Sequence, residues 1–314
     1  MGVLDLFKRA AAPLSRRPAF VGDDDLFDDE FQRKLDYLAM VSRRVFSGAM
    51  RAERRTKKTG SGVEFADHRD YAPGDDFRYL DWHAYQRFDR LLIRLYEEEE
   101  DLSIYFILDT SASMAFGDGE KLRQGKRLAA ALAYVGLANL DRIAIVTATD
   151  EVSGRMPQTR GKARIFRIFR FLRGVHAEGA TDLGEAMKTF VAQHKRRGLA
   201  VLLTDLYDPK GFERGINVLR YNRFEPFVLH IVDPREARPE LKGDVRVYDC
   251  ETGDEREVTV TAKVLERYAK AYGDYLDEAQ RFCTSRQVSY FRADVTIPFD
   301  ELILRVFRRG GFLR

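Results

Sequence analysis

The chain contains 314 residues, of which 45% are hydrophobic and 33% are charged. A chain of this length and hydrophobic content can bury a large core as one domain with an extension, which argues against intrinsic disorder as its overall state. Its 53 Lys and Arg residues nearly balance its 50 Asp and Glu residues, so no global field favours nucleic acid or an anionic membrane. The two cysteines, Cys250 and Cys283, are too far apart for a CxxC metal motif and too few for a disulfide framework.

No stretch approaches the roughly 18 consecutive apolar residues of a membrane span, and the N-terminus lacks the apolar core of a signal peptide. Together with the sparse cysteines, this predicts a cytoplasmic protein without a transmembrane segment. As an alternative, a short amphipathic helix at the N-terminus would place this cytoplasmic protein at a membrane surface. Residues 1–27 combine prolines with an acidic run and predict a flexible lead-in.

Residues 28–100 are expected to form an N-terminal extension. Its first part predicts an amphipathic helix that ends at Gly48, because apolar residues recur there at helical spacing: Phe31, Leu35, Leu38, Val41 and Val45. The basic run Arg51–Lys58 and the acidic run Glu97–Asp101 are interpreted as solvated faces. The acidic run is expected to separate two strands.

Residues 101–314 alternate between apolar strand patterns and helix patterns. Strands are expected at 104–109, 142–149, 199–206, 226–233 and 288–295, and helices near 120–139, 162–173, 182–197, 209–222, 261–286 and after Pro298. Continuous apolar strands with helical crossovers predict a doubly wound, Rossmann-like α/β fold with a mostly parallel sheet, whose ligand site lies beyond the carboxyl ends of the strands. Residues 242–260 break the alternation and predict an inserted hairpin.

Oxygen-bearing side chains stand at the ends of these strands. The stretch "YFILDTSASMAFGDG" places Asp109, Ser111 and Ser113 after the first strand, Thr181 precedes a helix in "GATDLGEAM", and Asp205 ends the strand in "VLLTDL". Each residue alone is as easily explained as a helix cap or a turn former. Together, two carboxylates and three hydroxyls form the ligand set of a hard divalent cation, Mg²⁺ with Mn²⁺ or Ca²⁺ as alternatives.

Two carboxylates only just neutralise a divalent ion, and hydroxyl groups donate weakly, so a metal held by these five residues would remain electrophilic. We therefore expect the ion to accept a further anionic ligand, a Glu or Asp side chain presented by a partner protein. The metal would then link two proteins and would not act as a catalyst. The loops that carry the site are expected to face solvent, so replacing Ser111 or Thr181 by Ala should weaken binding without unfolding the protein.

The motif "DTSAS", the threonine of "GATD" and the aspartate of "LLTD" resemble the metal-ion-dependent adhesion site, or MIDAS, of von Willebrand factor type A domains. The resemblance covers about residues 102–309. It implies a von Willebrand factor A-like fold in which the three hydroxyls bind the ion directly. The two carboxylates would bind it directly or through water.

The stretch "GSGVEFADHRDYAPGDDFRYLDWHAY", residues 60–85, is similar to the signature of a bacterial family, domain of unknown function number 58, whose members carry a type A-like domain. Members of that family are commonly associated with MoxR-type AAA ATPases. The resemblance therefore implies a non-enzymatic adaptor or co-chaperone in the assembly or metal-cofactor maturation of other proteins. No biochemical role follows from the signature itself, whose charges are interpreted as hydrogen-bonding a long loop to the sheet domain, with Trp82 as a packing anchor.

The main enzymatic alternative is a Mg²⁺-dependent phosphatase of the haloacid dehalogenase type, with Asp109 as nucleophile. That chemistry needs a second aspartate two residues later as acid/base, where this chain has Ser111. The stretch "GDGEKLRQGKR" lacks P-loop spacing and is interpreted as an exposed helix start. The arginine-rich residues 164–174 carry a helical apolar stripe, which favours helix packing over binding to nucleic acid or another anionic surface.

Overall fold

The computed structural model describes residues 10–11, 26–53, 55–59, 64–99 and 102–308. The chain divides into two compact units, Met1–Met40 with Leu102–Phe312 and Val41–Asp101 with Leu313–Arg314. We call the first the sheet unit and the second the small unit. The flexible lead-in predicted at residues 1–27 lies outside the described residues, apart from 10–11 and 26–27.

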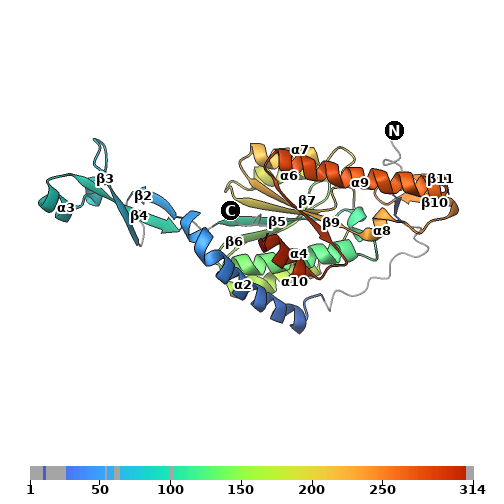
Figure 1. The fold of residues 1–314 in the computed structure, drawn as a ribbon, viewed down its shortest axis with the longest axis horizontal. Helices are drawn as coiled ribbons and strands as arrows, with labels where there is room; N and C mark the ends of the chain where they lie inside the picture. Colours follow the sequence, from blue (N-terminus) through green and yellow to red (C-terminus); the bar gives the residue numbers. More distant parts are fainter. Residues whose placement is uncertain (1–9, 12–25, 54, 60–63, 100–101, 309–314) are drawn as a thin grey trace. The chain divides into compact units, whose positions relative to one another are not determined.

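The sheet unit is built on a six-stranded sheet (Figure 1). Its strands in chain order are β5 (Ser103–Asp109), β6 (Arg142–Ala148), β7 (Val152–Thr159), β8 (Leu199–Thr204), β9 (Glu225–Val232) and β12 (Ser289–Asp294). They lie in the order β12-β9-β8-β5-β6-β7, and every neighbouring pair is parallel except β6 and β7. This arrangement confirms the predicted α/β class with a mostly parallel sheet.

The antiparallel edge strand β7 is missing from the sequence prediction, which expects only the five parallel strands. Of its eight residues only Met156 is buried, because an edge strand leaves much of its surface in solvent. The strand therefore lacks the continuous apolar run that identifies β5 and β8, in which every residue is buried.

Helices lie on both faces of the sheet (Figure 1). One face shares a hydrophobic core with α6 (Leu183–Gln193), α7 (Glu213–Tyr221) and α9 (Ala262–Ser285). On the other face α4 (Glu120–Ala138) packs on β5 and β6 and contacts α5 (Ile165–Arg173) and α10 (Phe299–Arg308). A Cβ atom at Gly125 of α4 would lie only 2.8 Å from Leu108 Cδ1, so this glycine allows the helix to approach the strand closely.

Helix α2 (Asp29–Glu53) contributes residues to both units. Its first turns belong to the sheet unit, where the ring of Phe31 lies 4.5 Å from that of Phe299. The extension predicted at residues 28–100 therefore begins later in the chain. The helix also continues past Gly48, because one glycine costs a helix only about 1 kcal/mol and does not end it.

A second, antiparallel sheet in the sheet unit has the strand order β1-β10-β11. It consists of β1 (Ala10–Ala11), β10 (Gly243–Asp249) and β11 (Glu255–Val260), and residues 250–254 form the turn between the last two strands. The short helix α8 (Pro234–Ala237) precedes this hairpin and begins with a capping box formed by Asp233 and Glu236.

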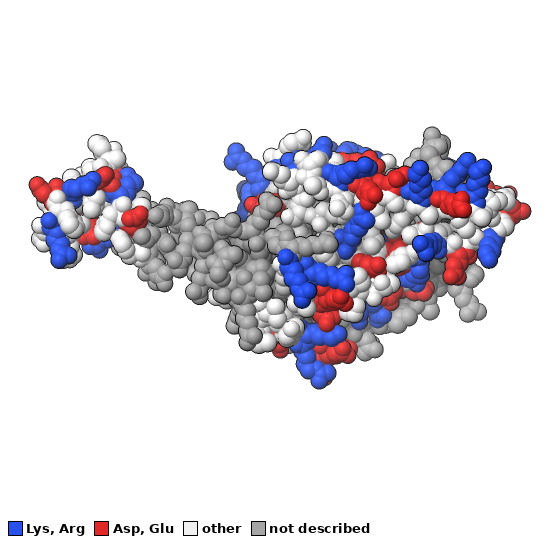
Figure 2. All heavy atoms as spheres, in the orientation of Figure 1, with Lys and Arg blue, Asp and Glu red and all other residues white. Residues whose placement is uncertain are grey.

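Charged residues on the sheet unit are mixed in sign on the face seen in Figure 2, where Lys and Arg alternate with Asp and Glu. The arginine-rich helix α5 buries its apolar stripe, which consists of Ile165, Ile168, Phe169 and Leu172. This burial confirms the helix-packing interpretation. Within the described part of the chain, no helix is both long enough and apolar enough to cross a membrane.

The small unit contains a three-stranded antiparallel sheet with the order β2-β4-β3. Its strands are β2 (Arg55–Thr59), β3 (Glu64–Asp70) and β4 (Leu92–Glu99). The basic and acidic runs pair with each other here, since Arg55 stands opposite Glu99 and Lys57 opposite Glu97. The acidic run thus largely belongs to a strand and does not merely separate two of them.

The charged signature residues of the small unit bond to one another. Asp75 accepts hydrogen bonds from Arg69 and from the backbone of Ala72. Asp81 accepts two backbone N–H groups at the start of α3 (Trp82–Phe88) and also bonds to His68 and Arg94. These bonds brace the signature loop within the small unit.

Trp82 was expected to anchor packing, but its residue surface is 57% exposed. Its place at the first position of α3 explains this, because Asp81 caps the helix there and the helix buries only Ala84.

Asp81→Asn should destabilise the small unit by about 1–2 kcal/mol, because an amide keeps the helix cap but weakens the hydrogen bonds that the carboxylate accepts from Arg94 and shares with His68. Arg94 and His68 hold the pKa of Asp81 far below its ordinary value of 3.8. The unfolded chain therefore takes up this proton first as the pH falls. The stabilisation is full above about pH 4 and declines below it. Urea unfolding followed by the fluorescence of Trp82, the only tryptophan, measures this.

The matched control is Asp76→Asn. Asp76 bonds only to its exposed neighbour Arg78 among the contacts described, and exposed pairs contribute little, so we expect the stability of the wild type. Equal effects of the two variants, or a difference that does not shrink as the pH falls from 7 to 3, would contradict the assignment.

Candidate metal centre

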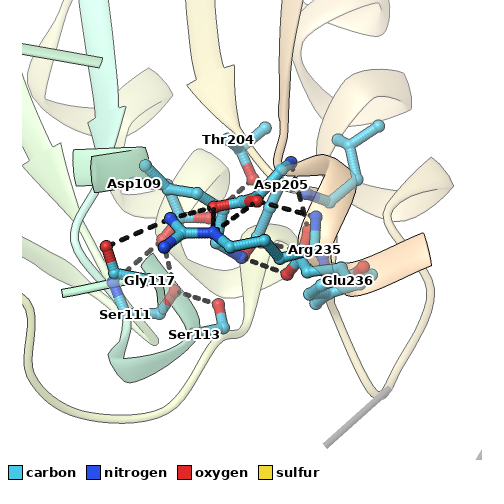
Figure 3. A network of polar contacts seen from close by, with 12 residues as sticks. Asp109, Ser111, Ser113, Gly117, Thr204, Asp205, Arg235 and Glu236 are labelled. Atoms are coloured by element: carbon cyan, nitrogen blue, oxygen red, sulfur yellow. Dashed lines mark hydrogen bonds and ion pairs between the residues drawn. The ribbon is translucent and has the colours of Figure 1, made fainter. Parts of the chain in front are cut away.

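The strand order of the main sheet reverses between β5 and β8, since the chain proceeds from β5 to β6 on one side and from β8 to β9 on the other. Ligands of doubly wound sheets bind at such a switch point, beyond the carboxyl ends of the strands. Asp109 is the last residue of β5 and Asp205 directly follows β8, so both stand at this point (Figure 3).

The three predicted residues of the β5 loop form one hydrogen-bonded cluster (Figure 3). Asp109 Oδ1 accepts from the backbone N–H of Ser111 at 3.0 Å and from its hydroxyl at 2.7 Å. Ser111 Oγ lies 3.0 Å from Ser113 Oγ. The second carboxylate oxygen of Asp109 accepts from Thr204 Oγ1 at 2.6 Å, which ties β5 to β8.

The loop that carries Thr181 is joined to the β5 loop by backbone hydrogen bonds, from Ala112 N to Gly179 O and from Glu178 N to Thr110 O. Asp182 caps helix α6, so the Thr181 side chain is not used as the cap. The Thr181 hydroxyl instead donates to Glu251 Oε1 at 2.7 Å, and its N–H donates to Glu251 Oε2 at 3.1 Å.

Asp205 is engaged by a lysine that sequence reasoning missed. Lys121 Nζ donates to Asp205 Oδ2 at 2.6 Å and to Glu236 Oε1 at 2.7 Å, and the lysine is 0% exposed. The other Asp205 carboxylate oxygen accepts from the backbone N–H of Tyr207. The predicted exposed helix start is therefore wrong at Lys121, because this first turn of α4 points into the buried charge cluster.

Burial, and after it the charge of Asp205, raises the pKa of Asp109 to about 6. Burial also raises the pKa of Glu251 to about 7, to which the charges of Asp205 and Asp109 contribute. Burial raises the pKa of Glu236 although the Lys121 ammonium opposes this. For Lys121, burial acts to lower the pKa, but the two carboxylates outweigh it and raise the pKa.

Lys121 thus pairs with two of the four carboxyl groups, Asp205 and Glu236, whereas Asp109 and Glu251 accept hydrogen bonds only from hydroxyl and backbone N–H groups among the contacts described. A bound divalent cation would reduce the excess of negative charge, which is the electrostatic condition for a metal centre.

The β5 loop offers the donor set of a hard cation, one carboxylate and two hydroxyls. Their oxygens are hydrogen-bonded to one another, with 3.0 Å between the Ser111 and Ser113 hydroxyls and 2.7 Å between Ser111 Oγ and Asp109 Oδ1. Metal–oxygen bonds of about 2.1 Å place adjacent ligand oxygens about 3.0 Å apart, so an octahedral cation would replace these hydrogen bonds with little movement of the loop. Within the described ranges, no three His, Cys, Asp or Glu side chains form a group that could hold a metal. A cation here would therefore depend on hydroxyl ligands, and these fit it.

The site is closed to solvent, contrary to the expectation of solvent-facing loops. All five predicted ligands are at most 6% exposed: Asp109, Ser111, Ser113, Thr181 and Asp205. The additional polar residues Lys121, Glu236 and Glu251 carry no spacing signal that joins them to this set. They come from a helix start, a second short helix and a hairpin turn, which only the folded chain brings together.

The family described as protein of unknown function DUF58 matches residues 67–276. The chain belongs to the DUF58 family. Two relatives, uncharacterized proteins of Mycobacterium tuberculosis and Mycobacterium bovis, are each 25% identical to it over 265 residues, covering 83% of this chain and 83% of theirs.

Two solved structures are similar at 15% sequence identity. They are a conserved hypothetical protein BatB from Bacteroides thetaiotaomicron, with a TM-score of 0.41 over 67% of this chain and 97% of that one, and an aerotolerance-related membrane protein from Bacteroides fragilis, with a TM-score of 0.40 over 66% and 99%.

Proposed function

We propose that this DUF58 protein is a non-enzymatic, divalent-metal-dependent protein interaction module with a von Willebrand factor A-like sheet unit. The observation that carries the proposal is the buried cluster of Asp109, Ser111 and Ser113 at the switch point of the sheet, which brings a carboxylate and two hydroxyls together. The order of the strands and the motif "DTSAS" followed by Thr181 and Asp205 support the same assignment.

Asp109, Ser111 and Ser113 would hold the ion, Mg²⁺ by preference, with Mn²⁺ or Ca²⁺ as substitutes. The ion would supply a strong electrostatic attraction for a carboxylate. Asp205 would act through water, because Lys121 and the Tyr207 N–H engage both of its carboxylate oxygens. A protein partner would complete the centre with a Glu or Asp side chain.

The partner that the family resemblance implies is a MoxR-type AAA ATPase, which makes this protein an adaptor or co-chaperone in the assembly or maturation of other proteins in the cytoplasm. The phosphatase alternative is weaker. Asp109 is 1% exposed, its oxygens accept hydrogen bonds from Ser111 and Thr204, and the acid/base position two residues later is Ser111.

Asp109→Asn should weaken Mn²⁺ binding by about tenfold or more, because it removes the one carboxylate of the hydroxyl-rich cluster. Isothermal titration calorimetry of the full chain measures this. The control is Asp150→Asn, an exposed carboxylate just after β6, for which we expect wild-type affinity. Equal affinity in both variants, or no Mn²⁺ binding by the wild type, would contradict the metal centre.

The interaction function is tested by capture of the host's MoxR-type ATPase on immobilised protein with Mg²⁺ or with a chelator. We expect retention with Mg²⁺ and loss with the chelator and in Ser113→Ala, which keeps the buried Lys121 ion pairs intact. If the ATPase is retained both with the chelator and by Ser113→Ala, the contact does not depend on the metal centre. Hydrolysis of a phosphomonoester that Asp109→Asn abolishes would instead establish the phosphatase.

A further inference from the structure

Glu251 lies in the turn of the β10–β11 hairpin, 70 residues along the chain from Thr181, yet binds it through both carboxylate oxygens. The hydroxyl and the N–H of Thr181 each donate to a different oxygen of this carboxylate. Thr181 is one of the hydroxyl groups that the sequence assigns to the metal centre. The contact therefore brings an acidic side chain of the same chain to the site where a partner's acidic side chain is proposed to bind.

The turn is shaped to present this side chain. Asp249 Oδ1 accepts the backbone N–H groups of Glu251 and Thr252 at 2.9 and 3.2 Å, and Gly253 N donates to Asp249 O at 2.9 Å. Gly253 adopts φ 75°, a conformation that favours glycine. These bonds fix the backbone of the turn so that its glutamate points inward, although the flanking residues 252–257 are exposed.

Backbone hydrogen bonds agree with this placement. The loop that ends at Thr181 is joined to the β5 loop from Ala112 N to Gly179 O and from Glu178 N to Thr110 O, so the contact with Thr181 brings Glu251 to the same end of the sheet as Asp109. The Lys121 ammonium is already shared by Asp205 and Glu236. A cation between the β5 loop and Glu251 would compensate the charge of these two further carboxylates.

Resting on the proposed function, we infer that Glu251 is the site's own anionic ligand, which fills the position of the partner carboxylate until a partner displaces it. The hairpin then acts as an internal plug. The plug accounts for the burial of Thr181, whose hydroxyl and N–H both bond to Glu251. It also defines the partner group as an acidic side chain on a tight turn or an extended tip, able to replace this turn.

The test is chemical rescue of Mn²⁺ binding in the full chain, measured by calorimetry. Glu251→Ala should bind Mn²⁺ about 10- to 100-fold more weakly than the wild type, because it loses an anionic ligand. Added acetate should restore much of that affinity in Glu251→Ala and leave the wild type unchanged, because only the variant has an open carboxylate position. Glu251→Gln, which keeps the side-chain volume, should lose affinity without being rescued.

The control is Glu257→Ala on the same hairpin, whose glutamate is 80% exposed and pairs with Arg246, and which should bind Mn²⁺ like the wild type. Wild-type affinity in Glu251→Ala would overturn the inference, and so would a loss that acetate does not restore. If Asp109→Asn loses Mn²⁺ binding while Glu251→Ala keeps it, the role of Glu251 is contradicted and the metal centre is supported. If the wild type binds no Mn²⁺, both the role of Glu251 and the metal centre are contradicted.

Discussion

Lys121→Met is expected to lower the free energy of unfolding by about 3–5 kcal/mol, because it leaves Asp205 and Glu236 buried without their shared ammonium. Methionine retains most of the side-chain volume, so packing against the rings of Phe116 and Tyr207 changes little. The loss then reports the charge and not a cavity. Urea unfolding of the sheet unit, followed by far-ultraviolet circular dichroism, measures it.

Lys188→Met is the matched control, since Lys188 pairs with Glu185 and both side chains are more than half exposed. Exposed pairs contribute little, so this variant should change stability by less than about 0.5 kcal/mol. Adding Glu236→Gln to Lys121→Met should recover part of the loss, because it removes one of the two stranded charges. If Lys121→Met is as stable as Lys188→Met, the ammonium does not hold this cluster together.

Phe31→Ala is expected to destabilise the sheet unit by about 3–4 kcal/mol. Phe31 is 3% exposed, and its ring lies 5.9 Å from that of Phe169 and 4.5 Å from that of Phe299. Truncating it removes the buried surface of an aromatic ring and leaves a cavity between α5 and α10. The same urea unfolding experiment measures the effect.

The control for this variant lies on the same helix. Tyr37 is 54% exposed, so Tyr37→Ala should cost less than about 1 kcal/mol. Similar losses at the two positions would mean that the start of α2 does not form part of the sheet unit's core. A large difference would show that α2 begins inside the sheet unit and not in a separate extension.

The fold class was predictable because the strands carry their own signal. Strand β5 is buried at all seven positions, so its residues "SIYFILD" read as a continuous apolar run. The three oxygen-bearing side chains of the β5 loop could also be grouped from the sequence, because Asp109, Ser111 and Ser113 lie within five residues of one another. Local spacing determines such contacts, since the chain has little freedom to separate them.

The charged runs illustrate the opposite case. Residues near Arg55 and Glu99 are each strongly charged and, taken alone, are typical of solvated surface. Only the pairing of β2 with β4 sets them opposite one another. The same holds for β7 and for Trp82. The exposure of β7 follows from its place at the edge of the sheet, and that of Trp82 from its place at the start of a short helix, and neither place can be read from the local sequence.

The sequence by itself thus determined the alternating strands and helices, the end of the sheet at which the candidate ligands gather, and the compact oxygen cluster around Ser111. The tertiary structure alone decided what surrounds that cluster. Lys121 meets Asp205 and Glu236 across 84 and 115 residues, and Glu251 meets Thr181 across 70. Contacts over such distances leave no periodicity in the chain, because folding closes those loops to bury apolar surface elsewhere and the charges meet as a consequence.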